Sequence, residues 1–169
     1  MNYADIRPVD VANGPGVRVS LFVSGCTHHC QGCFNPETWD FDHGHPFTGA
    51  QEGEILALLG RSYISGLSLL GGEPFEPENQ QAVLSLVCRV REQLPQKNIW
   101  AYSGFLFEDL RDGTIGQHSR ALLQQLDVLV DGPFVLERKN LSLPFRGSDN
   151  QRLIHVPRSL AAGEVVFWK

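Results

Sequence analysis

Four short stretches of the sequence share a pattern that restricts the fold more than any other feature. Each is apolar, rich in β-branched or aromatic residues, and ends at a glycine-containing turn; they are 17–25, 66–72, 98–104 and 127–134. Helical patterns occupy the intervals, at 52–63, 77–94 and 118–126. Strands that alternate with helices predict parallel β/α units joined by right-handed crossovers. We therefore expect an α/β fold whose ligand site lies where the C-terminal ends of the strands meet.

The length and charge of the chain limit what it can be. With 169 residues, 42% of them hydrophobic, it can form one sizeable core, so we expect a single domain over 1–169. Within it, 152–156 and 164–169 look like short strands, and an irregular segment begins at about 137. A net charge of −5 offers no broad attraction for nucleic acid or anionic lipid. The N-terminus lacks a signal-peptide pattern and no apolar run approaches the ~20 residues of a membrane span, so we expect a cytoplasmic protein.

The run GCTHHCQGCFNP (25–36) places Cys26, Cys30 and Cys33 close together, whereas Cys88 lies in a helical pattern and is expected to pack there. In a reducing compartment such a cluster indicates metal or redox chemistry. The spacing would suit a helix face, but the intervening polar residues and glycine give neither an apolar stripe nor helix propensity.

Two kinds of metal site remain open for these cysteines. A structural zinc ion would need a fourth ligand from His28, His29 or Cys88, although such sites usually have two separate ligand pairs. An iron-sulfur cube could be held through three of its irons, leaving the fourth iron without a protein ligand. That open iron would itself be a binding site.

The Cys-x3-Cys-x2-Cys spacing of CTHHCQGC resembles the signature of the radical S-adenosylmethionine superfamily, and GLSLLGGEPFEPEN resembles its GGE element. Gly71 and Gly72 have no side chains to block a ligand at the strand edge, and Glu73 can accept hydrogen bonds from an ammonium.

Further motifs resemble one family of that superfamily, the activating proteins of anaerobic ribonucleotide reductase. They are ANGPGVR, LFVSGC, QGCFN, GLSLLGGEP, NIWAYSG, DVLVDGPF and FRGSDNQ, and they cover residues 2 to about 155. Many superfamily members have an aromatic residue before the third cysteine, whereas this family and this chain have a glycine, Gly32.

The resemblance implies a partial, incomplete β/α barrel of about five or six mostly parallel strands. It implies two cofactors, one 4Fe-4S cluster held by Cys26, Cys30 and Cys33, and S-adenosyl-L-methionine. A reduced cluster would cleave S-adenosylmethionine to a 5′-deoxyadenosyl radical, which would abstract a hydrogen from a glycine of the reductase. The implied partners are the large subunit of anaerobic ribonucleoside-triphosphate reductase and an electron donor such as flavodoxin or ferredoxin.

The same resemblance implies a set of cofactor-binding residues and no catalytic side chain beyond the cluster and the cofactor. The set is Gly32, Cys33, Phe34, Asn35, Gly71, Gly72, Glu73, Ser103 and Asp131. Ser103 and Asp131 end later strands and could equally be a strand-capping hydroxyl and a turn aspartate.

The residues outside this set have no assigned role. Arg146 and Asn150 are candidates for contact with the reductase or the adenosyl group, or lie in a solvated loop. His28 and His29 are expected in an exposed loop, not as ligands.

Two alternative functions stay open at this point. The first is an activase of another glycyl-radical enzyme such as pyruvate formate-lyase, whose activating family is typically longer. The second is a zinc-stabilised binding module without catalysis.

Overall fold

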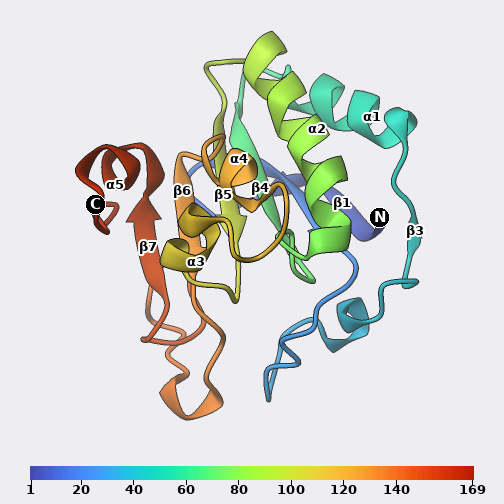
Figure 1. Cartoon of the computed structure of the whole chain (residues 1–169). Coiled ribbons are helices and arrows are strands. Elements are labelled where there is room, and N and C mark those ends of the chain that lie inside the picture. The colour runs from blue at the N-terminus through green and yellow to red at the C-terminus, as the bar shows by residue number, and fades with distance from the viewer.

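The computed structural model describes all residues from 1 to 169, and its seven strands form one mixed sheet (Figure 1). The strands are β1 (Asn2–Asp10), β2 (Val17–Val23), β3 (His45–Pro46), β4 (Ile64–Gly71), β5 (Asn98–Tyr102), β6 (Val128–Asp131) and β7 (Arg152–His155). The α-helices are α1 (Gly49–Leu59), α2 (Pro77–Gln93), α3 (Phe107–Asp112), α4 (Ser119–Leu123) and α5 (Val156–Ala162). Two 3-10 turns, η1 (Pro36–Trp39) and η2 (Leu136–Arg138), lie in the connecting loops. No helix combines the length and the apolar composition needed to cross a bilayer.

The strand order is β3-β1-β2-β4-β5-β6-β7, and its four central strands are parallel. The α/β fold and these four strands were predicted and are confirmed. The sheet has seven strands where five or six were predicted, and it is mixed, because β1, β3 and β7 pair antiparallel to their neighbours. β1 and β3 lie at one edge of the sheet and β7 lies at the other.

The C-terminal region differs from the sequence prediction. The strand predicted at 152–156 is present as β7, but the segment 164–169 makes only an isolated bridge from Phe167 to Ile154. The helix α5 stands between them, with Pro157 in its first turn and Gly163 after its end. Proline at a helix start and glycine after its end are typical boundary residues, so the sequence does contain the signal for this helix.

The two faces of the sheet have different coverings, because successive side chains of a strand point to opposite sides. Val19, Leu21 and Val23 of β2 belong to a core of 24 buried residues that includes the apolar faces of α1, α2 and α4. Figure 1 shows α1 and α2 on this side of the sheet. On the opposite face, Trp100 and Val128 pack with Phe145 and Trp168 from the C-terminal region.

A polar cluster occupies the second face near the beginning of the parallel strands. The guanidinium of Arg18 is fully buried and donates to Ser68 Oγ at 2.6 Å and to Asn98 Oδ1 at 2.7 Å. Burial lowers the pKa of Arg18 to about 10. Ser68 donates in turn to the carbonyl of Asn13, which fixes the loop between β1 and β2. This end of the second face is therefore filled by protein groups, and the C-terminal end is left for a ligand.

Candidate active site

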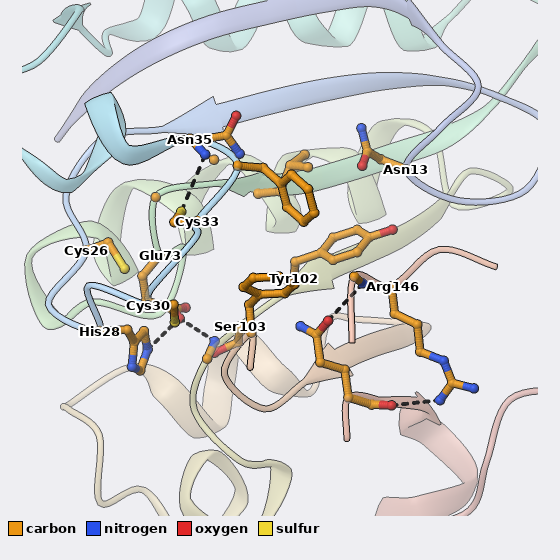
Figure 2. A pocket seen from close by; sticks show the side chains of 18 of the residues that line it. Asn13, Cys26, His28, Cys30, Cys33, Asn35, Glu73, Tyr102, Ser103 and Arg146 are labelled. Carbon is orange, nitrogen blue, oxygen red and sulfur yellow. Dashed lines mark hydrogen bonds and ion pairs between the residues drawn. The ribbon is translucent and has the colours of Figure 1, made fainter. Parts of the chain in front are cut away.

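A cavity of about 570 Å³ lies at the C-terminal ends of β2, β4, β5 and β6. Most of the residues expected at the site line it: Cys26, Cys30, Cys33, Phe34, Asn35, Gly71, Gly72, Glu73 and Ser103. Figure 2 shows the three cysteines on one side of this pocket and Tyr102 with Asn13 on the other. Its volume lies in the range of small-molecule and cofactor sites. The cavity is where parallel strands were expected to place it.

The cysteine loop connects β2 to η1, and its backbone is not helical. Gly25, His29 and Gly32 all have positive φ angles, of 96°, 48° and 76°. The backbone amides of Gly25 and Cys26 donate to the carbonyls of Thr38 and Trp39 in η1. These left-handed residues turn the chain repeatedly, so the helical spacing of the cysteines does not reflect a helix.

Burial shifts the acidity of the thiols in the metal-free protein. Burial raises the pKa of Cys26 to about 12 and also raises the pKa of Cys30. Both thiols are therefore protonated at neutral pH, and a metal that binds there must displace their protons.

The arrangement of ligands distinguishes a cluster from a single ion. The cysteines at 26, 30 and 33 are half-buried and line the same cavity, yet no group of three or more His, Cys, Asp or Glu side chains is placed to hold one metal ion. Cys88 is half-buried on α2 and does not line the cavity. Three thiols on one loop that share a cavity can hold three irons of a four-iron cluster, and His28, which lines the same cavity, contacts Glu73.

Glu73 is 1% exposed, and its carboxylate is hydrogen-bonded on both oxygens. Oε1 accepts from the Phe75 amide at 2.9 Å, and Oε2 accepts from the Gly104 amide at 2.7 Å and contacts His28 Nε2 at 2.9 Å. Backbone bonds add to this, because the Glu73 amide donates to the Gly25 carbonyl at 2.8 Å. The GGE element and the cysteine loop are thus joined directly.

His28 does not lie in the exposed loop that was expected. Its side chain is 17% exposed, packs edge-on against Phe105 at 4.4 Å between ring centroids, and faces Glu73 (Figure 2). Burial opposes its protonation, but the hydrogen bond and charge of Glu73 outweigh that effect and raise the pKa of His28. His29 is exposed as expected and stacks on Trp39 at 4.6 Å.

Glu76 is a second buried carboxylate in the same turn, and the sequence did not single it out. It is 4% exposed, and its Oε1 accepts from both the backbone amide and the hydroxyl of Thr27 at 2.7 Å. A second acidic residue just before a proline-started helix was the available signal. However, hydrogen bonds between residues 49 positions apart produce no periodic pattern in the sequence.

The two glycines of the GGE element are close-packed against the protein backbone. Gly71 has a φ of 102°, and a Cβ there would lie 2.8 Å from Phe22 Cα. A Cβ on Gly72 would lie 2.6 Å from the Gly25 carbonyl oxygen. Gly71 therefore lacks a side chain because it lies against β2, and Gly72 because the cysteine loop approaches the end of β4, in addition to any clearance for a ligand.

Aromatic side chains also line the cavity. The hydroxyl of Tyr102 is buried without a hydrogen-bond partner, and burial raises its pKa. Phe34 is 56% exposed, tilts against Phe134 at 5.1 Å, and lines the opening. Ser103 is buried, and its hydroxyl accepts from the amide of Phe105 at 3.1 Å. An unpartnered hydroxyl and an exposed aromatic ring are features of a surface that receives a ligand.

Four further residues occupy supporting positions. Asp131 is fully buried, bonds Arg152 Nε at 2.9 Å and the Phe107 amide at 2.8 Å, and does not line the cavity, which favours a structural role. Gly32 also lies outside the lining, where a Cβ would meet Leu136 at 2.8 Å. Arg146 lines the cavity while donating to the Gln151 carbonyl. Asn150 lies outside and donates to Pro133.

Comparison with known proteins agrees with an iron-sulfur site at the three cysteines. The family described as "4Fe-4S single cluster domain" matches residues 12–154. An anaerobic ribonucleoside-triphosphate reductase-activating protein of Vibrio cholerae is 47% identical over 157 residues, covering 92% of this chain and 97% of that protein. Proteins of the same name from Escherichia coli K12 and Enterobacteria phage T4 are each 43% identical, over 92% and 90% of this chain and 99% and 93% of their own lengths. The chain therefore belongs to the family of anaerobic ribonucleoside-triphosphate reductase-activating proteins.

Proposed function

We propose that this chain generates the glycyl radical of anaerobic ribonucleotide reductase, using a 4Fe-4S cluster and S-adenosylmethionine. The observation that carries the proposal is the set of three thiols, Cys26, Cys30 and Cys33, lining one cavity without a fourth cysteine. The membership of the family and the match to a 4Fe-4S domain support it. When bound, the reduced cluster would supply the electron that cleaves S-adenosylmethionine, and the radical so formed would remove a hydrogen from the α-carbon of the partner's glycine.

In this reaction the side chains of the protein bind the cluster and position S-adenosylmethionine. The three thiols would lose their protons and hold the cluster as thiolates, and the iron without a protein ligand would take the amino acid end of S-adenosylmethionine. The amides of Phe75 and Gly104 fix the carboxylate of Glu73, which lines the same cavity and would accept a hydrogen bond from the ammonium of S-adenosylmethionine. Oε1 accepts only one of these bonds and has a lone pair left for the ligand.

The remaining lining residues suit the nucleoside. Phe34 offers an aromatic face next to Cys33, and the Asn35 amide lies 3.4 Å from the Cys33 sulfur. Gly32 supplies the left-handed turn that lets Phe34 reach the opening. Ser103 lines the cavity from the end of β5, as a contact for the ribose or carboxylate group. Asp131 would act indirectly, by fixing Arg152 and the start of α3.

The architecture that we propose is a single-domain partial barrel over 1–169. The sheet ends in β3 on one side and β7 on the other, and these edge strands do not pair with each other. The segments that follow β2 and β6 extend from the same end of the sheet (Figure 1). An open sheet of this kind would admit the glycine-containing segment of the reductase large subunit, where a closed barrel would not. Flavodoxin or ferredoxin in the cytoplasm would supply the electron.

The test is formation of the radical on the partner. The reconstituted protein is mixed without oxygen with the reductase large subunit, S-adenosylmethionine and a reductant, and electron paramagnetic resonance follows the glycyl radical signal. We expect a signal that requires all components and disappears with Cys30→Ala. A signal on pyruvate formate-lyase but not on the reductase would assign the chain to the other activase class. Retention of zinc with no radical on either partner would replace the proposal by a binding module.

A further inference from the structure

The chain between Cys26 and Cys30 is anchored at two consecutive side chains. Thr27 bonds the carboxylate of Glu76 through its backbone amide and its hydroxyl, both at 2.7 Å. His28 bonds the carboxylate of Glu73 at 2.9 Å. The two glutamates belong to one turn, between β4 and α2, so a single rigid element holds both points.

The two acceptors are buried to an extent that makes these bonds hard to replace by water. Glu73 is 1% exposed and Glu76 is 4% exposed. A buried carboxylate that loses a donor keeps the cost of its desolvation, so the loop is strongly biased toward the bonded arrangement. Cys33 is not fixed this way, because it lies beyond the anchored segment and its amide bonds only the Cys30 carbonyl.

The shape of the neighbouring strand end adds a third constraint on His28. A Cβ on Gly104 would lie 2.5 Å from the imidazole, so the ring occupies the space that this glycine leaves open. Phe105 packs against the ring, and the Gly104 amide bonds the same Glu73 oxygen as the imidazole does. The imidazole is therefore held by contacts from the end of β5 as well as from the turn after β4.

We propose that Glu73 and Glu76 form a two-carboxylate clamp that holds the cysteine loop through His28 and Thr27, and so places Cys26 and Cys30 before iron binds. His28 and Thr27 are positioning residues, since they act through the loop that carries the thiols. Under the proposed function, on which this clamp rests for its ligand, Glu73 has a second contact with S-adenosylmethionine. The geometry of the cluster loop and the binding of that ligand are then linked through one side chain, and the linkage is reciprocal.

The test uses the full chain without metal, where no activity is needed. Alkylation of each cysteine by iodoacetamide is followed by mass spectrometry in the wild type and in His28→Ala, Thr27→Val and His28→Gln. We expect both clamp-breaking variants to raise the alkylation rate of Cys26 and Cys30 about tenfold, as for about 1.4 kcal/mol of lost local stability. Cys33 serves as the internal reference and should change less than twofold. The variant His28→Gln keeps a donor and should recover most of the wild-type protection.

A matched variant and a second readout keep the proposal open to refutation. His29→Ala removes an exposed ring of the same loop that bonds no carboxylate, and should leave Cys26 protected. After reconstitution, the time for a chelator to remove half of the iron should fall about tenfold in the clamp-breaking variants and little in His29→Ala. Wild-type protection and iron retention in both His28→Ala and Thr27→Val would overturn the clamp. If a variant unfolds, as circular dichroism would report, the His28→Gln comparison still decides.

The two proposals fail separately in this design. A wild type that holds iron, responds to clamp mutations and forms no glycyl radical would remove the proposed function and retain the clamp. If the wild type forms the radical and the clamp variants keep wild-type alkylation rates and iron retention, the proposed function stands and the clamp is overturned.

Discussion

The glycines of the GGE element illustrate how single residues serve fold and site together. Gly72 donates its amide to the Val23 carbonyl, and its Cα faces the carbonyl oxygens of Gly25, Thr38 and Val23. A methyl group at this position would push against backbone atoms, which cannot move away as a flexible side chain can. The glycine therefore sets how closely the cysteine loop approaches β4.

We expect Gly72→Ala to lower the free energy of unfolding of the metal-free protein by about 1–3 kcal/mol, as overpacking does. Urea denaturation followed by circular dichroism measures this. The control is Gly53→Ala in the exposed part of α1, where a Cβ meets no atom within 4 Å. That change should stabilise by about 0.5–1 kcal/mol, because alanine is the better helix residue. A Gly72→Ala protein as stable as the wild type would contradict the close approach of these backbones.

Several site residues could be predicted from sequence and several could not, for a physical reason. The cysteines, Glu73 and Ser103 stand in or beside local motifs at strand ends, and such motifs survive in a linear pattern. Thr27, His28 and Glu76 act through hydrogen bonds to distant segments, which no local pattern encodes. Asp131 was expected near the cofactor because it ends β6, but its carboxylate forms an ion pair with Arg152 on the neighbouring strand.

At the scale of elements, the junction of β1 with the following loop depends on one carboxylate. Asp10 ends β1 and is 6% exposed. Its carboxylate accepts from Ser20 Oγ at 2.6 Å, from Asn13 Nδ2 at 2.7 Å and from the Ala12 amide at 2.8 Å. Burial alone would raise the pKa of Asp10, but these hydrogen bonds together outweigh it and the pKa is lowered. Asp10 thereby fixes the loop that contributes Ala12 and Asn13 to the cavity.

This shift predicts a pH-dependent contribution to stability. Because the pKa of Asp10 is lower in the folded than in the unfolded protein, its stabilising contribution is fully present above about pH 4 and is lost as pH falls through the folded pKa. The stability difference between wild type and Asp10→Asn should therefore be largest near neutral pH and shrink on acidification. Urea midpoints between pH 7 and pH 2.5 measure it.

Asp5→Asn provides the control, since Asp5 pairs with Arg7 on the surface and each side chain is about half exposed. Exposed pairs contribute little, so this variant should stay within about 1 kcal/mol of wild type throughout. A difference between wild type and Asp10→Asn that is constant with pH would show that the carboxylate does not titrate with folding.

The elements themselves were predicted unevenly. The central parallel strands have two apolar faces or end at clear glycine turns, so composition marks them. β1 was missed because it is largely exposed and carries polar residues and Pro8, which indicate a loop when read alone. β3 has only two residues, His45 and Pro46, and pairing with β1 is what makes it a strand. Antiparallel edges of this kind depend on the neighbouring strand more than on their own sequence.

At the scale of the whole molecule, the cavity is assembled from short segments between Arg7 and Gln151 that lie far apart in the sequence. The α/β rhythm predicted that a site would lie at the C-terminal strand ends, because parallel strands end at one edge. The alternation of strands and helices could not predict how far the sheet closes, since closure depends on strand twist and edge pairing.

The most direct test of the account is electron paramagnetic resonance of the cluster itself. Protein prepared without oxygen, reconstituted with iron and sulfide and reduced with dithionite, is measured with and without S-adenosylmethionine. We predict a reduced 4Fe-4S signal that changes shape when the ligand is added and is lost in Cys30→Ala, while Cys88→Ala retains it. A colourless protein with stoichiometric zinc and no such signal would contradict the open-iron site on which the proposed function depends.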